Sequence, residues 1–595
     1  MPATSLASAA KREEAPEAQE AVKPRGSPRL MRQRMPSRQA LWPEALQAGV
    51  RNALRPAVLW CRGTWFYRQR LLGPVPDRIL FSPTDTRIRK LDEADGLIRG
   101  RFRLAGQRLD VRQGSVFDMP APSESFAVAL HGFDWLRHVE AAGGDLAKAF
   151  ALKVTQQWLK RYARFTPLVW RADIIADRLL NLFVHGRFFL PNSDLVWRSR
   201  LFVSMRDQAQ LLALTIDDAP PGIARLKCAV ALTLAGICLG DGRNTISGLK
   251  RLTLEIQREI LPDGGHLNRS PATLLEAYRL LTMVHEASGG VQPVVRGALD
   301  RIGPMLRFFR MGDGALAVFH GGNESDPRTV EATLDGDDVM GRPLGHAPYS
   351  GYQRLACGRT VVLWDAGPPA PGAYSVDAHA GCLAFEMSTG AQRLIVNCGM
   401  AVGESDEWVS ALRSTAAHST LTIDDTSSAS FLTGRLAGLL GSRLVDGPDL
   451  VETRRNEDAH GITVDANHDG YLAPFGAVHQ RRMTLSPRGT ALTGADRLIP
   501  AGPERRLGHS RKIPFTIRFH VHPDVRVSMA QGGGSVILKL ASGEGWRFRI
   551  ASGVLSIEES VYFGSGAPRR CEQLVISGGW QGEIMEYLWL FEQLG

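Results

Sequence analysis

Apolar side chains recur every three or four residues from about Leu41 to Met305, which is the spacing of amphipathic helices. Leu152, Val154, Trp158 and Leu159 follow this spacing in one segment, and Ile174, Leu179, Leu182 and Phe183 follow it in another. At one joint, turn formers at positions 217–222 precede a helix predicted from Ile223 to Leu239, which Gly240 would end. Successive helices with short joints predict a helical domain over residues 41–310.

Beyond about Met311 the apolar spacing changes to two, which predicts β-strands. The predicted strands cover residues 315–320, 360–364, 382–387, 393–397, 517–521, 535–540 and 546–550. Helices first and strands second favour two segregated domains over an alternating βαβ fold. We therefore expect a multidomain α and β protein, with an antiparallel β-sheet domain at 311–595 after the helical domain, and a disordered basic tail at 1–40.

The balance of charge adds a class of partner to this picture. A formal net charge of +10 favours long-range attraction to polyanions, which include acidic polysaccharides, nucleic acids and anionic membranes. Eight Lys and Arg residues fall within the first 40 positions, where we interpret them as part of a solvated tail. Since no nucleic-acid-binding motif accompanies them, we do not expect nucleic acid to be a partner.

The longest apolar run, from Cys228 to Gly240, is shorter than the roughly 20 residues that a membrane-spanning helix needs. We therefore expect no stable membrane insertion. The first 40 residues also lack the apolar stretch of a secretory signal. The seven cysteines form no CxxC pair, and we interpret them as reduced thiols that are mostly buried.

A glycine-rich loop at positions 262–269 precedes a sharp helix start. Ser270 is a good N-cap and Pro271 suits the first helical turn, so the loop would lie against a helix N-terminus, which is a suitable place for an anion. Its polar side chains are a possible base, an amide and a cation that could pair with a uronate, namely His266, Asn268 and Arg269. The alternative is a loop that only caps the helix.

Several short segments together resemble the heparinase II/III family over roughly residues 70–595. They are His131–Leu136, Leu261–His266, His379–Glu386, Leu394–Gly399 and Arg413–Thr420. The resemblance implies an (α/α) toroid followed by a β-sandwich-like domain, with a polysaccharide lying in the groove between them. It also implies lyase chemistry, in which the chain is cleaved beside a uronic acid by β-elimination.

β-Elimination needs a group that neutralises the uronate carboxylate, a base for the C5 proton and an acid for the leaving oxygen. The resemblance makes His379 the candidate base or acid, and Arg269 or His266 the candidate contact to the carboxylate. Substrate contacts are expected from Asn268, Trp135 and Asp377. A core histidine is the competing interpretation of His379.

The chain departs from the family pattern at two other catalytic positions. The neutralising Asn or His that often follows a glycine is replaced in Gly222-Ile223-Ala224-Arg225, and Pro271–Leu274 offers no tyrosine where a catalytic one is expected. Where many members have His-x-His-x-Asp, this sequence has Asp377 at the first position and Gly381 at the last.

The resemblance also implies a zinc site at His379, Asn397 and His418. Neutral imidazoles suit zinc, whereas an amide in place of a carboxylate supplies less charge. The alternative is a hydrogen-bonded network that lines the groove.

The sequence thus predicts a polysaccharide lyase-like enzyme that acts on an acidic, uronate-containing polysaccharide. Two alternatives stay open: a catalytically silent protein that binds an acidic glycan, and a glycoside hydrolase on the same scaffold with Asp263 and Asp377 as paired carboxylates. The location also stays open, because the missing signal favours the cytoplasm and the family resemblance favours the periplasm or cell envelope.

Overall fold

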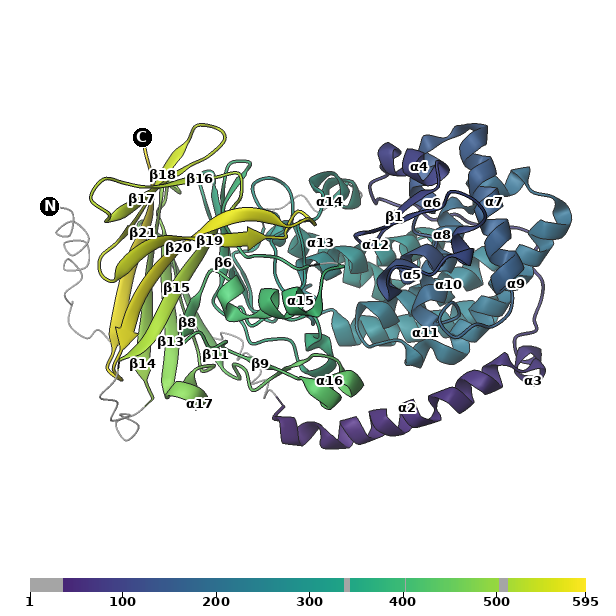
Figure 1. Ribbon diagram of the computed structural model, residues 1–595, viewed down its shortest axis with the longest axis horizontal. Coiled ribbons are helices and arrows are strands. Elements are labelled where there is room, and N and C mark those ends of the chain that lie inside the picture. The colour runs from purple at the N-terminus through teal and green to yellow at the C-terminus, as the bar shows by residue number, and fades with distance from the viewer. Residues whose placement is uncertain (1–35, 336–342, 402, 502–511) are drawn as a thin grey trace.

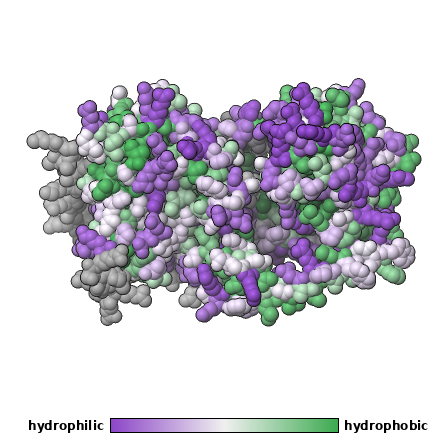
Figure 2. All heavy atoms as spheres, in the orientation of Figure 1, coloured by the Kyte–Doolittle hydropathy of each residue, from purple (hydrophilic) through white to green (hydrophobic). Residues whose placement is uncertain are grey.

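The computed structural model describes residues 36–335, 343–401, 403–501 and 512–595. It places the helices and the strands in two halves that lie side by side along the longest axis of the molecule (Figure 1). The surface is hollowed between the two halves (Figure 2). This segregation agrees with an α toroid followed by a β-sandwich, the architecture that the sequence predicts.

The helical half is built from antiparallel neighbours with short joints. Its main helices are α4 (Leu91–Ile98), α5 (Glu124–His131), α6 (Leu136–Ala142), α7 (Gly144–Tyr162), α8 (Ala172–Phe189), α9 (Leu195–Thr215), α10 (Ile223–Leu239), α11 (Gly242–Glu259), α12 (Pro271–Ala287) and α13 (Pro293–Phe309). Helix α10 begins and ends as predicted, and Gly240 takes the left-handed conformation that a C-cap requires. Helix α12 begins at Pro271 as predicted, although the side chain of Ser270 makes no capping hydrogen bond.

Two local expectations fail in this region. A hairpin of β1 (Arg101–Leu104) and β2 (Gln107–Asp110) interrupts the helices. The strand predicted at 315–320 is wrong, because its backbone groups find other partners: the N–H of Ala317 bonds the end of α13 and the N–H of Val318 bonds the carboxylate of Glu386. The side chains of a buried segment can follow the alternating pattern of a strand while its backbone groups form hydrogen bonds outside any β-sheet.

The other half is built mainly on two large antiparallel sheets, beside a short pair of β9 (Ser430–Phe431) and β10 (Leu444–Val445). In the described part of the chain one has eight strands in the order β11-β12-β13-β14-β21-β18-β17-β16, and the other runs β19-β20-β15-β7-β6-β5-β4-β3, with β8 beside β15. Their bounds are β3 (His346–Ala347), β4 (Tyr352–Cys357), β5 (Thr360–Asp365), β6 (Phe385–Thr389), β7 (Gln392–Val396), β8 (Leu421–Ile423), β11 (Val451–Asp458), β12 (Gly461–His468), β13 (Ala477–Leu485), β14 (Ala491–Pro500), β15 (Ile513–Val521), β16 (Arg526–Met529), β17 (Ser535–Lys539), β18 (Gly545–Ile550), β19 (Val554–Tyr562), β20 (Arg569–Trp580) and β21 (Met585–Gln593). The predicted strands after residue 359 each overlap one of these, with β6 beginning three residues late.

An N-terminal segment lies outside both halves. Residues 1–35 of the predicted tail fall outside the described residues, and a short 3-10 helix already forms at Arg38–Leu41. It leads into α2 (Trp42–Gly63) and α3 (Trp65–Gln69), and α2 runs along the lower edge of the molecule beneath both halves (Figure 1). Within the described residues, no helix combines the length and apolarity required to span a bilayer.

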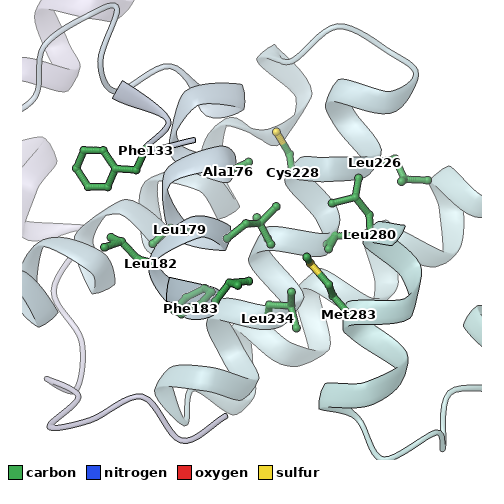
Figure 3. Close-up of a cluster of buried hydrophobic side chains, with 14 of the residues drawn as sticks. Phe133, Ala176, Leu179, Leu182, Phe183, Leu226, Cys228, Leu234, Leu280 and Met283 are labelled. Carbon is green, nitrogen blue, oxygen red and sulfur yellow. The ribbon is translucent and has the colours of Figure 1, made fainter. Parts of the chain in front are cut away.

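The helical core depends on a close crossing of α10 and α11. A Cβ atom added to Gly236 would lie 2.2 Å from the backbone nitrogen of Thr245, and one added to Gly248 would lie 2.5 Å from that of Thr233. On its other sides α10 packs against α8 and α12, where Leu179, Leu234 and Met283 fill the interior (Figure 3).

Replacing Gly236 by Ala is expected to destabilise the protein by about 1–3 kcal/mol, because the added methyl group must push α11 away. Gly297→Ala is the matched control, since Gly297 also lies inside a helix but its added Cβ would meet only Arg301 Nη1 at 3.7 Å. That control should raise stability by up to about 1 kcal/mol through helix propensity. Urea unfolding measures both, and equal effects would contradict the crossing.

Candidate functional site

Arg269 spans the junction between the two halves. Its guanidinium donates to the backbone oxygens of Ser350 (2.8 Å) and Gly367 (3.2 Å) and forms an ion pair with Asp365. The group also lies 4.8 Å from the ring centroid of Tyr352. Because every edge of the buried guanidinium already has a partner in the β half, Arg269 fixes the two halves together rather than presenting a cation to a ligand.

A chain of three histidines continues from this ion pair. His320 Nε2 lies 2.9 Å from Asp365, and its Nδ1 accepts from the backbone N–H of His379 at 3.3 Å, so the proton of His320 is on Nε2. His418 Nδ1 donates to the oxygen of Ser414 at 2.7 Å, which leaves its Nε2 to accept from His379 Nδ1 at 3.0 Å. His379 Nε2 is therefore left with a lone pair and no protein partner within the described residues.

A buried imidazole with a free lone pair looks like a base, but its environment weakens it. Burial lowers the pKa of His379 well below its usual value, and the nearby His418 and His320 lower it further. Burial likewise lowers the pKa of His418 to about 4. A general base works best when its pKa lies near the working pH, so His379 is poorly suited to remove a C5 proton at neutral pH.

The glycine-rich loop is held by its own contacts. His266 bonds Glu259 through Nε2 (3.0 Å) and Asn268 through Nδ1 (2.7 Å), and the Asn268 amide also donates to Thr273 (3.0 Å). The Asp263 carboxylate accepts from the backbone N–H groups of positions 265, 349 and 350 and from a serine hydroxyl. These side chains build the joint between α11 and α12, and Asp263 also ties this joint to the start of the β half.

The zinc ligands that the resemblance implies are arranged for hydrogen bonding. His379 and His418 point ring nitrogens at each other, and Asn397 accepts from the N–H of Ser419 (3.1 Å) and donates to the oxygen of Val318 (3.3 Å). Among the described residues, no three His, Cys, Asp or Glu side chains gather closely enough to hold a metal ion. These side chains are engaged in hydrogen bonds with one another and with the backbone, and zinc binding stays a prediction.

Gly381 explains why His418 lies where it does. A Cβ atom at position 381 would stand 2.7 Å from the His418 ring, so the aspartate that many family members have there could not coexist with this ring position. The ring takes the space of the missing carboxylate.

The predicted substrate contacts Trp135 and Asp377 lie in different settings. Trp135 is fully buried among aromatic rings of the helical core, and its indole N–H donates to the oxygen of Leu130 at 3.2 Å. Its ring is therefore not available to stack on a sugar. Asp377 is exposed at the surface of the β half.

The most unusual surface is one that sequence reasoning missed. Large apolar side chains with 42–74% of their surface exposed recur along α2 at Trp42, Leu46, Val50, Leu54, Val58 and Trp60. Leu54 follows Ala45 by nine residues, or about two and a half turns, so it points away from the body that Ala45 contacts. The apolar periodicity of this exposed helix is the same as that of a buried one, so the sequence predicts it as one more helix of the toroid.

Helix α2 is attached to both halves by its ends. Near its start, Leu41, Ala45 and Ala48 pack on α16 (Gly434–Leu440), and Glu44 pairs with Arg443 at 2.8 Å. Near its end, Arg62 pairs with Asp218 of the helical half at 2.7 Å. Every residue from 51 to 58, in the middle of the helix, is exposed.

Arginines border one side of the apolar face. Arg51 and Arg55 lie on successive turns, and Arg62 follows two turns later, where it pairs with Asp218. Glu44, the one acidic residue of α2, is also paired. Figure 2 shows this edge of the molecule as a mixture of hydrophobic and polar atoms. An apolar sector with a basic border is typical of helices that lie in a membrane interface.

Comparison with known proteins places this geometry on a recognised scaffold. Residues 339–589 match the family model described as "Heparinase II/III-like, C-terminal". The curated "FtsZ-localized protein C" of Caulobacter vibrioides (strain NA1000 / CB15N) is 34% identical over 569 residues, which cover 91% of this chain and 97% of that protein.

Solved lyases share the fold. The crystal structure of heparinase III aligns with a TM-score of 0.65 at 14% identity, over 93% of this chain and 91% of that chain. A mutant of the heparan sulfate lyase HepC from Pedobacter heparinus aligns with a TM-score of 0.58 at 16% identity, over 92% of this chain and 90% of that chain. The architecture is therefore that of the polysaccharide lyase scaffold.

Arg269→Gln is expected to destabilise the protein by about 3–5 kcal/mol at pH 7, because the buried Asp365 carboxylate loses its counter-ion. Burial alone would raise the pKa of Asp365, but Arg269 and His320 outweigh it and the net shift is downward. The ion pair therefore stabilises the protein above the unfolded carboxyl pKa of about 3.9, and this contribution is lost as the pH falls towards the folded value.

Urea unfolding between pH 7 and pH 3 tests this, with Arg62→Gln as the control for an exposed ion pair worth less than about 1 kcal/mol. Equal losses in the two variants, or a deficit for Arg269→Gln that does not shrink in acid, would show that Arg269 is not the joint described.

Proposed function

This chain belongs to the heparinase II/III family, and we propose that it is a non-catalytic member that attaches to an anionic membrane surface through α2 and acts where FtsZ is found. The observation that carries the proposal is the exposed apolar sector of α2 with its arginine border.

Exposure of this sector is costly in water. Burying a large apolar side chain stabilises a protein by about 1.5–3 kcal/mol, so six such side chains on one helix represent a large driving force for association. Each arginine near an anionic surface adds roughly 1 kcal/mol. The formal charge of +10 acts in the same direction. Attachment of this kind is peripheral and requires no spanning helix.

The proposed link to FtsZ comes from the name of a relative. The name "FtsZ-localized protein C" belongs to a protein that matches this chain over nearly its whole length at 34% identity. We extend that localisation to this chain, with α2 as the element that faces the membrane.

Loss of lyase chemistry is supported by the buried network. Arg269 is used by Asp365, His418 fills the space beside Gly381, and the pKa of His379 is low. To bind a uronate, Arg269 would have to abandon a buried ion pair, which costs about 3–5 kcal/mol. β-Elimination of an acidic polysaccharide is the rival function, and the family scaffold is what favours it.

The purified chain is expected to sediment with vesicles that contain phosphatidylglycerol and to sediment less with vesicles of phosphatidylcholine alone. Leu46→Glu with Leu54→Glu should weaken this binding by about a hundredfold or more, since at least about 3 kcal/mol of apolar contact is lost. Arg51→Gln with Arg55→Gln should weaken binding to the anionic vesicles and leave binding to the neutral ones unchanged.

Leu195→Glu with Val196→Glu is the matched control, because these two apolar side chains are equally exposed at the start of α9. Binding that survives the α2 variant, or that the α9 variant abolishes equally, would refute attachment through α2. A dimer in light scattering that only the α2 variant dissolves would assign the sector to a second copy of the chain instead.

Incubation with heparan sulfate, chondroitin sulfate and alginate tests the rival function. We expect no rise in the ultraviolet absorbance of unsaturated uronates, and no difference between the wild type and His379→Ala. A rise that His379→Ala abolishes would establish a lyase and overturn the non-catalytic assignment.

A further inference from the structure

A cavity opens on the outer side of the helical half, between α7 and α9 and beside α3. Its volume of about 540 Å³ lies in the range of small-molecule sites. These three helices stand at the end of the helical half that is farther from the β half (Figure 1). The cavity is therefore separate from the junction of the two halves. We call it the α7–α9 cavity, and Arg68, Leu159, Lys160, Trp197, Arg200 and Asp207 are among the residues that line it.

Three cations at the rim of the cavity have no counter-ion. Arg68 comes from α3, Lys160 from the last turn of α7 and Arg200 from the second turn of α9, and all three are exposed. Within the described residues none of them forms an ion pair or a side-chain hydrogen bond, whereas the neighbouring Arg161 pairs with Asp118. Like charges around one opening repel each other, so an anion that enters the cavity would be attracted by all three.

The buried side of the cavity offers a hydrogen-bond acceptor. Asp207 is only 5% exposed, and its Oδ1 accepts from Nε (3.0 Å) and Nη2 (2.6 Å) of Arg206. Its second oxygen, Oδ2, has no hydrogen-bond partner in the part of the chain that the structure describes. Because Arg206 balances the charge of the carboxylate, Asp207 does not cancel the three cations of the rim. Buried polar atoms normally have a partner, so Oδ2 marks a place for a donor of a ligand.

A phosphate ester of a small polyol matches these features. A phosphate monoester carries a charge of about −1.5 to −2 at pH 7 and has three strong acceptor oxygens, one for each cation of the rim. A hydroxyl group on the alcohol part can donate to the free oxygen of Asp207. The carbon atoms of the ligand can pack against Leu159, Trp197 and Val203, which supply the apolar part of the lining.

We infer that the α7–α9 cavity binds a phosphate ester of a small polyol, with Arg68, Lys160 and Arg200 donating to the phosphate and Asp207 accepting from a hydroxyl group. The inference does not rest on attachment through α2, because the residues that line the cavity do not belong to the apolar sector of that helix. Two sources share this chemistry, namely a free phosphorylated polyol and the headgroup of phosphatidylglycerol.

Titration calorimetry of the full chain at low ionic strength tests the inference with sn-glycerol 3-phosphate. This probe is expected to bind at about millimolar concentration or below. Ethyl phosphate carries the same phosphate group without a hydroxyl, so it should bind at least about fivefold more weakly, because the hydrogen bond to Asp207 is missing. Arg68→Gln with Arg200→Gln should weaken the binding of glycerol phosphate at least about tenfold, because two charge-assisted contacts are lost.

Arg243→Gln with Arg296→Gln is the matched control. These two arginines lie on α11 and α13, outside the cavity, and like Arg68 and Arg200 they are exposed and have no ion-pair partner among the described residues. Both double variants therefore lose the same charge and should fold, but only the cavity variant should lose affinity for glycerol phosphate.

Sedimentation with vesicles that contain phosphatidylglycerol distinguishes the two sources. A larger loss of sedimentation for the cavity variant than for the control variant would identify the lipid headgroup as the source. Equal sedimentation, together with weaker binding of glycerol phosphate by the cavity variant, would identify a free phosphate ester. Three results would each overturn the inference: equal affinity for ethyl phosphate and glycerol phosphate, equal weakening in the two variants, or no heat with glycerol phosphate at about 10 mM together with equal sedimentation.

Discussion

The ion pair between Arg269 and Asp365 is the contact on which the junction of the two halves depends. It joins the loop before α12 to the end of β5, and from it the position of His320 follows, then that of His379 and finally that of His418. A charge buried without its partner is strongly destabilising, so this order of contacts leaves the junction little freedom to rearrange. Arg269 and His379, which the family resemblance marks as candidate catalytic groups, both lie within this chain of buried contacts.

The sequence predicts the architecture because periodicity is a local property. The helix from Ile223 to Leu239 and the start at Pro271 are marked by glycine and proline beside a regular apolar pattern. The strand predicted at 315–320 is wrong because every residue of this segment is buried. Its apolar pattern therefore indicates burial and not pairing with a neighbouring strand. Family resemblance also brings His379 and His418 together correctly, at 3.0 Å. It cannot tell that Arg269 has a carboxylate partner nearly a hundred residues away, since that pairing exists only in the tertiary structure.

The exposed face of helix α2 escaped prediction. An apolar face looks the same in sequence whether or not another element covers it, so exposure at Leu46 or Leu54 becomes visible only in the fold. This face lies where the scaffold leaves side chains accessible, whereas the family motifs lie where it packs them. The fold alone therefore does not determine which of its surfaces takes part in recognition.

The attachment of α2 at both ends has a mechanical consequence. The helix is fixed to the β half near Glu44 and to the helical half near Arg62. A partner that binds the middle of the helix therefore also limits the movement of one half relative to the other. Rotation of one half about the junction would have to bend the helix between these two points of attachment. Pro56 lies near the middle of the helix and lacks the N–H that completes a helical turn, so the helix would bend most easily there. The stiffness of the whole molecule is thus set in part by one residue far from the junction itself.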